Sequence, residues 1–308
     1  MCLEIYQILL LILLGALVGI SMSFVGQTGQ GVVIPIVFLI TEDILLAITV
    51  SVLNDLITAS AVSIGYLRNK QFKFRKDTFI LVIVAIIGSF LGVLILMITP
   101  LGNIFSIVIP IFIIGMGLII LKNGFPTTES LKTTVMNLAR RIVKKEKYEE
   151  LQISFEKKLE AQTMADFDEI VGIIPSGSRI FYYLAIGFGF YIGINSGMFG
   201  ANSGFIITLV LVMLYGYPLK KGVGTALILS IFVCISCFTI YQLLGVTIKG
   251  HYYFNIEITL FLAIGSIITG FFASSYIQSL SAKTMGRGMA LATISLGLVS
   301  LIFYFITK

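Results

Sequence analysis

Ten apolar segments make up most of this 308-residue chain, and they restrict its fold more than any other feature. Most of them hold about 20 residues, the length of helix that crosses the hydrocarbon core of a bilayer. Only 12% of the residues are charged, whereas a soluble domain has about 25%. The sequence therefore predicts an all-α integral membrane protein. The segments are Ile5–Val25, Gly31–Ile40, Ile44–Leu67, Thr78–Thr99, Asn103–Leu121, Arg179–Met198, Gly204–Tyr215, Gly222–Gly245, Glu257–Gln278 and Gly288–Ile306.

The segments form two similar sets of five, one on each side of a polar stretch. Each set opens with a long segment, a glycine-rich break and a short segment, and three longer segments follow. Such an order is typical of a duplicated membrane unit. We therefore expect an N-terminal transmembrane repeat (1–121), a charged helical insert (122–178) and a C-terminal transmembrane repeat (179–308).

The second segment of each set is too short for an ordinary span. Gly31–Ile40 has 10 residues, about 15 Å of helix at 1.5 Å per residue, against roughly 30 Å of hydrocarbon. We therefore expect a broken or re-entrant helix at the start of each repeat. Whether residues 31–40 and 204–215 span the membrane or re-enter stays open at this point.

Basic residues predict the topology. Five of them follow the third segment, between Arg68 and Lys76, and cytoplasmic loops of membrane proteins are rich in Lys and Arg. With this loop inside, all of the 21 basic residues except Lys249 and Lys308 fall on the cytoplasmic side. Because each set has five segments, the two sets run in opposite directions. This is the inverted-repeat plan of many secondary transporters, placed here in the plasma membrane as a multi-pass protein.

The polar stretch 122–178 lies on the cytoplasmic side in this topology. Apolar residues recur at helical spacing within it, for example Leu131, Val135, Leu138 and Ile142. The pattern fits either a solvated linker helix or an element that docks on the membrane surface or on a cytoplasmic partner.

Enzyme signatures are missing from the sequence. His251 is the only histidine, so a zinc motif that needs two histidines, such as H-E-x-x-H, is absent, and no Walker sequence is present. We expect no catalytic residue, no cofactor and no metal site. The net charge of +6 follows from topology and does not indicate nucleic acid. Cys234 and Cys237 form a C-x-x-C spacing inside an apolar segment, where they are either small packing residues or a redox or metal pair.

The two glycine-rich breaks are the candidate site. Backbone of this kind at membrane depth is tolerated only where protein or a wet cavity satisfies its polar groups, although close helix packing is the alternative use of membrane glycines. Each break precedes a short helix, whose N-terminus can bind an anion without a basic side chain. The substrate-binding candidates in the breaks are Gly26, Gln27, Thr28, Gly29, Gln30, Gly31, Gly200, Asn202, Ser203 and Gly204.

One carboxylate lies deep in a predicted span. Asp55 stands near the middle of Ile44–Leu67. A carboxylate inside the membrane is costly, so its presence there suggests a function. It is either a protonated structural group, a proton-coupling group or a cation ligand. The adjacent Asn54 would supply a hydrogen-bond partner.

The breaks and their surroundings resemble the sulfite exporter TauE/SafE family, the four-transmembrane sulfite exporters. The resemblance rests on the first break with Pro35, on the loose helix-start match at residues 47–51, and on the closer match Gly222-Val223-Gly224-Thr225-Ala226. It covers most of both halves but not residues 122–178, which are longer than the usual family linker. From the helix-start motif, Ser51 and Thr225 join the substrate-binding candidates.

The resemblance implies transport of sulfite, organosulfonates or related sulfur-containing anions, coupled to protons. We therefore expect a membrane transporter that exports a small anion, with Asp55 and Asn54 in proton coupling. The oligomeric state stays open, with a homodimer as one option. Two other functions stay open: a cation transporter or channel built on Asp55, and a membrane scaffold that acts through the insert 122–178.

Overall fold

The computed structural model describes residues 4–26, 29–74, 76–99, 179–200, 203–213, 215 and 217–280, with isolated residues between 111 and 122 and between 284 and 305. Within these residues every regular element is a helix. In the first half the helices are α1 (Ile5–Val25), α2 (Gln30–Thr41), α3 (Ile44–Arg68) and α4 (Lys76–Ile98). In the second half they are α8 (Arg179–Phe199), α9 (Ser203–Met213), α10 (Leu219–Leu244), the π-helical turn η1 (Gly245–Lys249) and α11 (Ile256–Ile277).

Local signals at the helix ends explain where several of these helices begin. The Asp43 side chain accepts hydrogen bonds from the backbone N–H groups of Leu45 (2.9 Å) and Leu46 (3.1 Å) at the start of α3. Asn255 does the same for Ile258 at the start of α11 (3.1 Å). Such N-caps satisfy N–H groups that have no partner inside the helix.

The distribution of polar and apolar side chains is that of a membrane protein. Large apolar side chains such as Ile5, Ile83 and Phe272 are exposed, while Asp55 and Thr58 are completely buried. Five helices of the described residues are long and apolar enough to cross a bilayer. The chain is therefore an all-helical integral membrane protein, as the sequence predicts.

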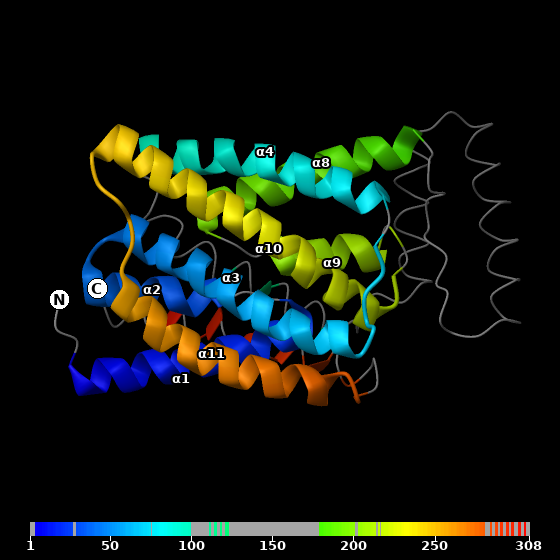
Figure 1. Cartoon of the computed structure of the whole chain (residues 1–308), viewed down its shortest axis with the longest axis horizontal. Helices are drawn as coiled ribbons and strands as arrows, with labels where there is room; N and C mark the ends of the chain where they lie inside the picture. Colours follow the sequence, from blue (N-terminus) through cyan, green and yellow to red (C-terminus); the bar gives the residue numbers. More distant parts are fainter. Residues whose placement is uncertain are drawn as a thin grey trace, which may run out of the picture.

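Two pairs of long helices form the sides of the molecule, and each pair joins the two halves of the chain. Helix α1 packs along α11, and α4 packs along α8 (Figure 1). Glycines allow both contacts, because a Cβ atom at Gly15 would stand 2.0 Å from the carbonyl oxygen of Leu262, and one at Gly193 would stand 2.1 Å from that of Ala85. Close backbone approach at small residues is the usual way in which membrane helices associate.

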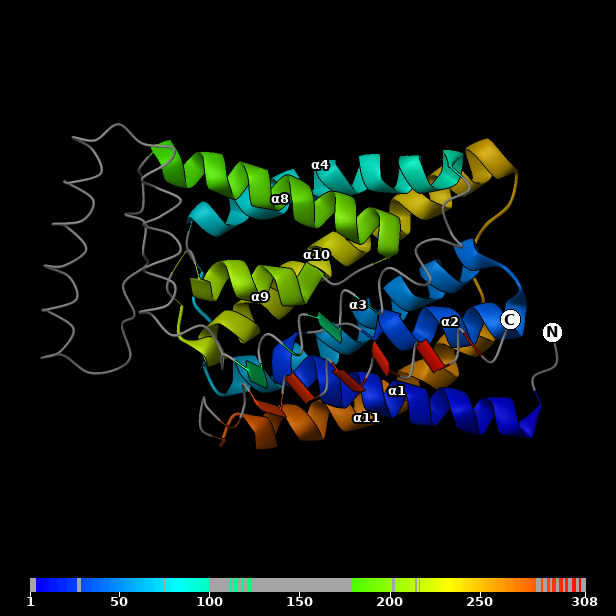
Figure 2. The ribbon, with the colours of Figure 1, turned by 180° about the vertical axis from the view of Figure 1, so that it is seen from behind.

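The short helices and the two longest helices lie between these pairs (Figures 1 and 2). Helix α2 turns back along α1, so that Val33 and Val37 of α2 share a buried cluster with Leu11 and Leu14 of α1. Helix α10 packs against α3, α4 and α9. It begins beside the end of α3, where a Cβ at Gly224 would meet the carbonyl oxygen of Gln71. Helices α3 and α10 therefore run in opposite directions through the middle of the molecule.

The helix bounds agree closely with those expected from the sequence. Helix α1 covers the predicted residues, α2 is one residue longer than predicted at each end, and α3 is one residue longer at its end. Helix α9 ends at Met213, two residues before the predicted Tyr215. The insert 122–178 and nearly all of Asn103–Leu121 lie outside the described residues, so the division into three parts stays a prediction.

Candidate functional site

In both breaks a glycine with positive φ ends the preceding helix. Helix α1 ends at Gly26 (φ 68°), and α8 ends at Gly200 (φ 77°). Both values lie in the left-handed region, which only glycine adopts without strain. Each turn leads at once into a short helix: α2, whose N-cap is Gly29, and α9, which begins at Ser203.

The two breaks lie against each other. A Cβ atom at Gly204 would stand 2.4 Å from the carbonyl oxygen of Gly26, and one at Gly200 would stand 3.2 Å from Nε2 of Gln30. The breaks come from opposite halves of the chain, and the start of α2 thus reaches the end of α8. Four of the sequence-predicted residues therefore meet at one place inside the protein.

Asp55 lies at the same place. The backbone N–H of Gly29 donates to Oδ1 of Asp55 over 3.4 Å, so the carboxyl group of α3 faces the start of α2. Asp55 is completely buried, and among the described residues it is the only buried side chain that carries a formal charge. Desolvation of an ionised carboxylate is costly, and protonation relieves the cost.

Asn54 connects this place to α11. Its Oδ1 accepts a hydrogen bond from Oγ of Ser266 (3.2 Å), and both residues are completely buried. Its Nδ2 has no hydrogen-bond partner within the described part of the chain. The amide of this residue, which precedes Asp55 in α3, therefore keeps a donor available.

Three buried hydroxyl groups near the breaks also lack a hydrogen-bond partner within the described part of the chain. Ser51 of α3, Ser196 of α8 and Ser203 of α9 are completely buried, and their oxygens make no hydrogen bond to any described residue. A buried polar group without a partner costs about 1–3 kcal/mol, so native proteins place such groups where they serve a purpose. These hydroxyls are neutral donors suited to an anionic ligand.

Thr225 contacts the loop between α3 and α4. In the second turn of α10, its hydroxyl oxygen accepts a hydrogen bond from the backbone N–H of Lys73 over 3.0 Å. The side chain therefore anchors the loop between α3 and α4. Gly31 lies in the first turn of α2. Gln27, Thr28 and Asn202, which the sequence also suggested, lie outside the described residues.

Sequence reasoning passed over three residues at this site. Ser196 stands in the second break but was not selected, although its polarity inside an apolar helix was a usable signal. Ser266 gave no local signal, since its contact with Asn54 joins residues 212 positions apart. Cys234 of α10 lies beside Ser203 and within electrostatic reach of Asp55.

The site thus combines neutral donors, two helix N-termini and one carboxyl group. Among the described residues, no three His, Cys, Asp or Glu side chains are grouped so that they could hold a metal ion. Helix N-termini and hydroxyls stabilise a small anion without a basic side chain. The carboxyl group opposes an anion when ionised and tolerates it when protonated.

Comparisons with known proteins point to one family. The family model described as "Sulfite exporter TauE/SafE" matches residues 11–300, nearly the whole chain. The searches of curated proteins and of solved structures gave no significant match. Members of the matched family are membrane transporters, which agrees with the buried polar site between apolar helices. The chain therefore belongs to the sulfite exporter TauE/SafE family.

Proposed function

We propose that this protein carries sulfite, an organosulfonate or a related small sulfur-containing anion across the plasma membrane, coupled to protons through Asp55. The observation that supports this most strongly is the contact between Asp55 and the backbone N–H of Gly29, at the place where the two breaks meet. One buried carboxyl group there touches the backbone that would hold the anion.

The donors around the breaks suit a sulfur oxyanion. The oxygens of a sulfite or sulfonate group accept several hydrogen bonds at once, and Ser51, Ser203 and Nδ2 of Asn54 offer buried donors. The N-termini of α2 and α9 add partial positive charge. Each hydrogen bond to a charged acceptor contributes about 1.5–3 kcal/mol, so a few of them suffice for a transported ligand.

Electrostatics links the anion to a proton. Two unit negative charges about 4 Å apart repel by about 4 kcal/mol at an effective dielectric constant near 20. That energy corresponds to about a thousandfold in affinity. Protonation of Asp55 removes the repulsion, so proton and anion favour each other's binding. Asn54 and Asp55 together then form the proton-coupling group.

Joint binding determines the driving force. One proton and one monovalent anion carried together move no net charge, so the membrane potential neither helps nor opposes the step. The concentration gradient of the anion and the pH gradient then set the direction. A cell that produces the anion internally exports it by this route, with the insert 122–178 on the cytoplasmic side.

Flux measurements in proteoliposomes test the proposal. The purified full chain is reconstituted, and uptake of sulfite, sulfate and taurine is followed with and without an imposed pH gradient. We expect uptake of at least one of these three solutes to accelerate when the outside is acidic. Sodium or potassium flux without any anion flux would instead support the cation transporter built on Asp55.

A further inference from the structure

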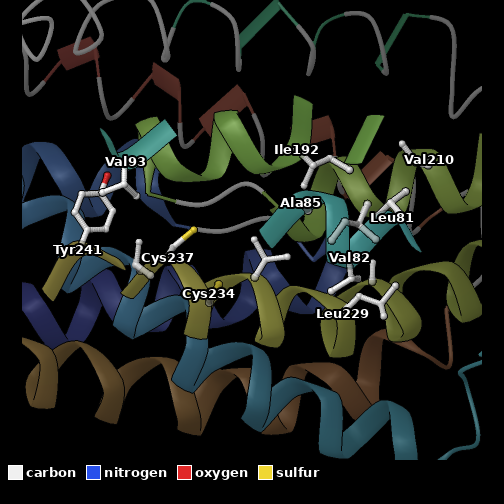
Figure 3. Packing of buried hydrophobic residues seen from close by; sticks show 14 of the residues in the cluster. Leu81, Val82, Ala85, Val93, Ile192, Val210, Leu229, Cys234, Cys237 and Tyr241 are labelled. Carbon is white, nitrogen blue, oxygen red and sulfur yellow. The ribbon is translucent and has the colours of Figure 1, made fainter. Parts of the chain in front are cut away.

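Cys234 lies on the face of α10 that is turned toward the second break. It follows Ser230 by one helical turn, and residues four apart lie on the same helix face. Ser230 Oγ would stand 3.5 Å from a Cβ atom at Gly204. Figure 3 shows Cys234 on α10 between Cys237 and Leu229, inside the packed interior. The thiol therefore lies beside the start of α9.

Three polar groups from three helices converge there. The Cys234 thiol lies beside the Ser203 hydroxyl of α9 and within electrostatic reach of Asp55 of α3. Ser203 is completely buried, and its oxygen makes no hydrogen bond of ordinary geometry to a described residue despite the neighbouring sulfur. Cys234 itself is 2% exposed. A buried hydroxyl that makes no hydrogen bond of ordinary geometry within the described part of the chain, next to a thiol, keeps a donor for a ligand.

We propose that Cys234 lines the anion path and helps to select polarisable, sulfur-bearing anions. The inference rests on the proposed transport function and extends it to a residue in the second half of the chain. A thiol is a weak donor with a polarisable sulfur. It contacts the sulfur and oxygens of a weakly hydrated anion well, and it competes poorly with water for a strongly hydrated one.

Cys237 provides a matched control in the same helix. It is also buried, but it lies beside Ser89 of α4 and Tyr241 of α10, whereas Cys234 lies beside Ser203 of α9. Ser89 in turn contacts Ser236 over 3.3 Å. Cys237 therefore belongs to the packing between α10 and α4. The two cysteines share a residue type, a helix and a degree of burial, and they differ in their neighbours, since Cys234 lies beside Ser203 and Cys237 beside Ser89.

Thiol modification tests the placement of Cys234. The full-length protein, with Cys2→Ser and Cys237→Ala, is treated in proteoliposomes with 2-sulfonatoethyl methanethiosulfonate or with its cationic trimethylammonioethyl counterpart. The Cys234 sulfur bonds to the sulfenyl sulfur of the reagent, methanesulfinate leaves, and the thiol proton passes to solvent. The anionic reagent carries a sulfonate and so resembles the proposed substrates.

We expect the anionic reagent to modify Cys234 faster than the cationic one by on the order of tenfold or more, as a pathway selective for anions requires. Sulfate or taurine, whichever the protein carries faster, should slow the reaction. Sulfite is unsuitable here because it attacks the reagent itself. With Cys2→Ser and Cys234→Ala instead, the remaining Cys237 should show neither preference nor protection.

Flux selectivity gives a second readout. Cys234→Ala should lower the ratio of sulfite flux to sulfate flux several-fold, and Cys237→Ala should leave this ratio unchanged. Equal rates with the two reagents, unprotected or absent modification of Cys234, or an unchanged flux ratio would overturn the role of Cys234. Any of these results alongside normal anion flux would leave the transport function intact. Absence of anion flux from the unmodified protein would refute the transport function itself.

Discussion

The backbone N–H of Gly29 donates to Oδ1 of Asp55 over 3.4 Å, which joins the start of α2 to the middle of α3. The charge on the Asp55 side chain therefore acts directly on the backbone of the first break. Since the second break lies against the first, a change at Asp55 also reaches the place where Gly204 contacts the carbonyl of Gly26. In the proposed function, proton binding and anion binding therefore act on one structural element.

Replacement of Asp55 by asparagine should uncouple the transporter. Asn keeps an oxygen that can accept the Gly29 N–H, but it resembles the protonated carboxyl group permanently. We expect Asp55→Asn to fold and insert, to exchange anion across the membrane, and to lose acceleration by a pH gradient. Anion counterflow and pH-driven uptake, measured at equal protein levels, separate the two effects.

Asn54 supplies the comparison for this experiment. Asn54→Asp introduces a second carboxyl group next to the first, so it should weaken anion binding and shift the pH dependence of transport to more acidic values.

A variant Asp55→Asn that still responds fully to an imposed pH gradient would exclude Asp55 as the coupling group.

The contact between the breaks should tolerate no added methyl group. A Cβ atom at Gly204 would stand 2.4 Å from the carbonyl oxygen of Gly26, far inside the contact distance of a carbon and an oxygen. We expect Gly204→Ala to push the breaks apart and to reduce anion flux more than tenfold, about the effect of 1.4 kcal/mol. Gly187→Ala is the control, because nothing lies within 4 Å of a Cβ at that position.

Flux that is normal in Gly204→Ala would show that the breaks need not touch during transport. Gly29→Val is a poorer test. A Cβ at Gly29 would stand 2.0 Å from Cγ2 of Val18, so its loss of flux would mix packing with binding.

The buried serine hydroxyls should contribute to anion affinity. Each of Ser51→Ala and Ser203→Ala removes one donor to a charged acceptor, worth about 1.5 kcal/mol or more, so the KM for the anion should rise about tenfold or more while protein levels stay unchanged. Thr239→Val in α10 is the control, since Thr239 is exposed and its hydroxyl donates to the carbonyl of Ile235 in its own helix. An unchanged KM in both serine variants would place the ligand elsewhere.

Opposite ends of the molecule should face opposite sides of the membrane. Asn69 ends α3 beside the start of α10, whereas Tyr252 lies next to Tyr253, which is close to Asp43 at the other end of α3. We predict that Asn69 is cytoplasmic and Tyr252 external. Single cysteines at these positions, in a background of Cys2→Ser, Cys234→Ala and Cys237→Ala, can be labelled with an impermeant reagent in intact cells.

Labelling of Asn69→Cys from outside would contradict the predicted topology and the inverted repeat with it. The same prediction places Ser154 inside and Gly102 outside, two positions outside the described residues.

The sequence is a good guide to the helices because their limits have local causes. Apolar runs determine α3 and α4, Asp43 and Asn255 cap the helices that follow them, and Gly26 permits the turn that ends α1. The chemistry of the first break was also visible locally, since glycines and amides stand together where an apolar run is interrupted.

Contacts between distant residues could not be predicted in this way. Thr225 belongs to a motif at a helix start, yet its hydroxyl is bound to Lys73, 152 positions away. Cys234 resembles an ordinary packing residue until α9 and α3 are placed around it. One sequence gives the order of helices along the chain but not which helix lies beside which, because apolar helix faces are interchangeable in composition.

Helix α1 packs on α11 and α4 packs on α8, so each pair joins a helix of the first half to a helix of the second. This pairing has a consequence for how the protein is made. Helix α1 leaves the ribosome well before α11, because the glycines of α11 that complete its contact, Gly265 and Gly270, are translated some 250 positions later. Until then the Gly15 and Gly19 surface of α1 is covered by lipid or by the insertion machinery. The first half therefore cannot mature as a finished unit, and quality control of the nascent chain must wait for the last helices to be inserted.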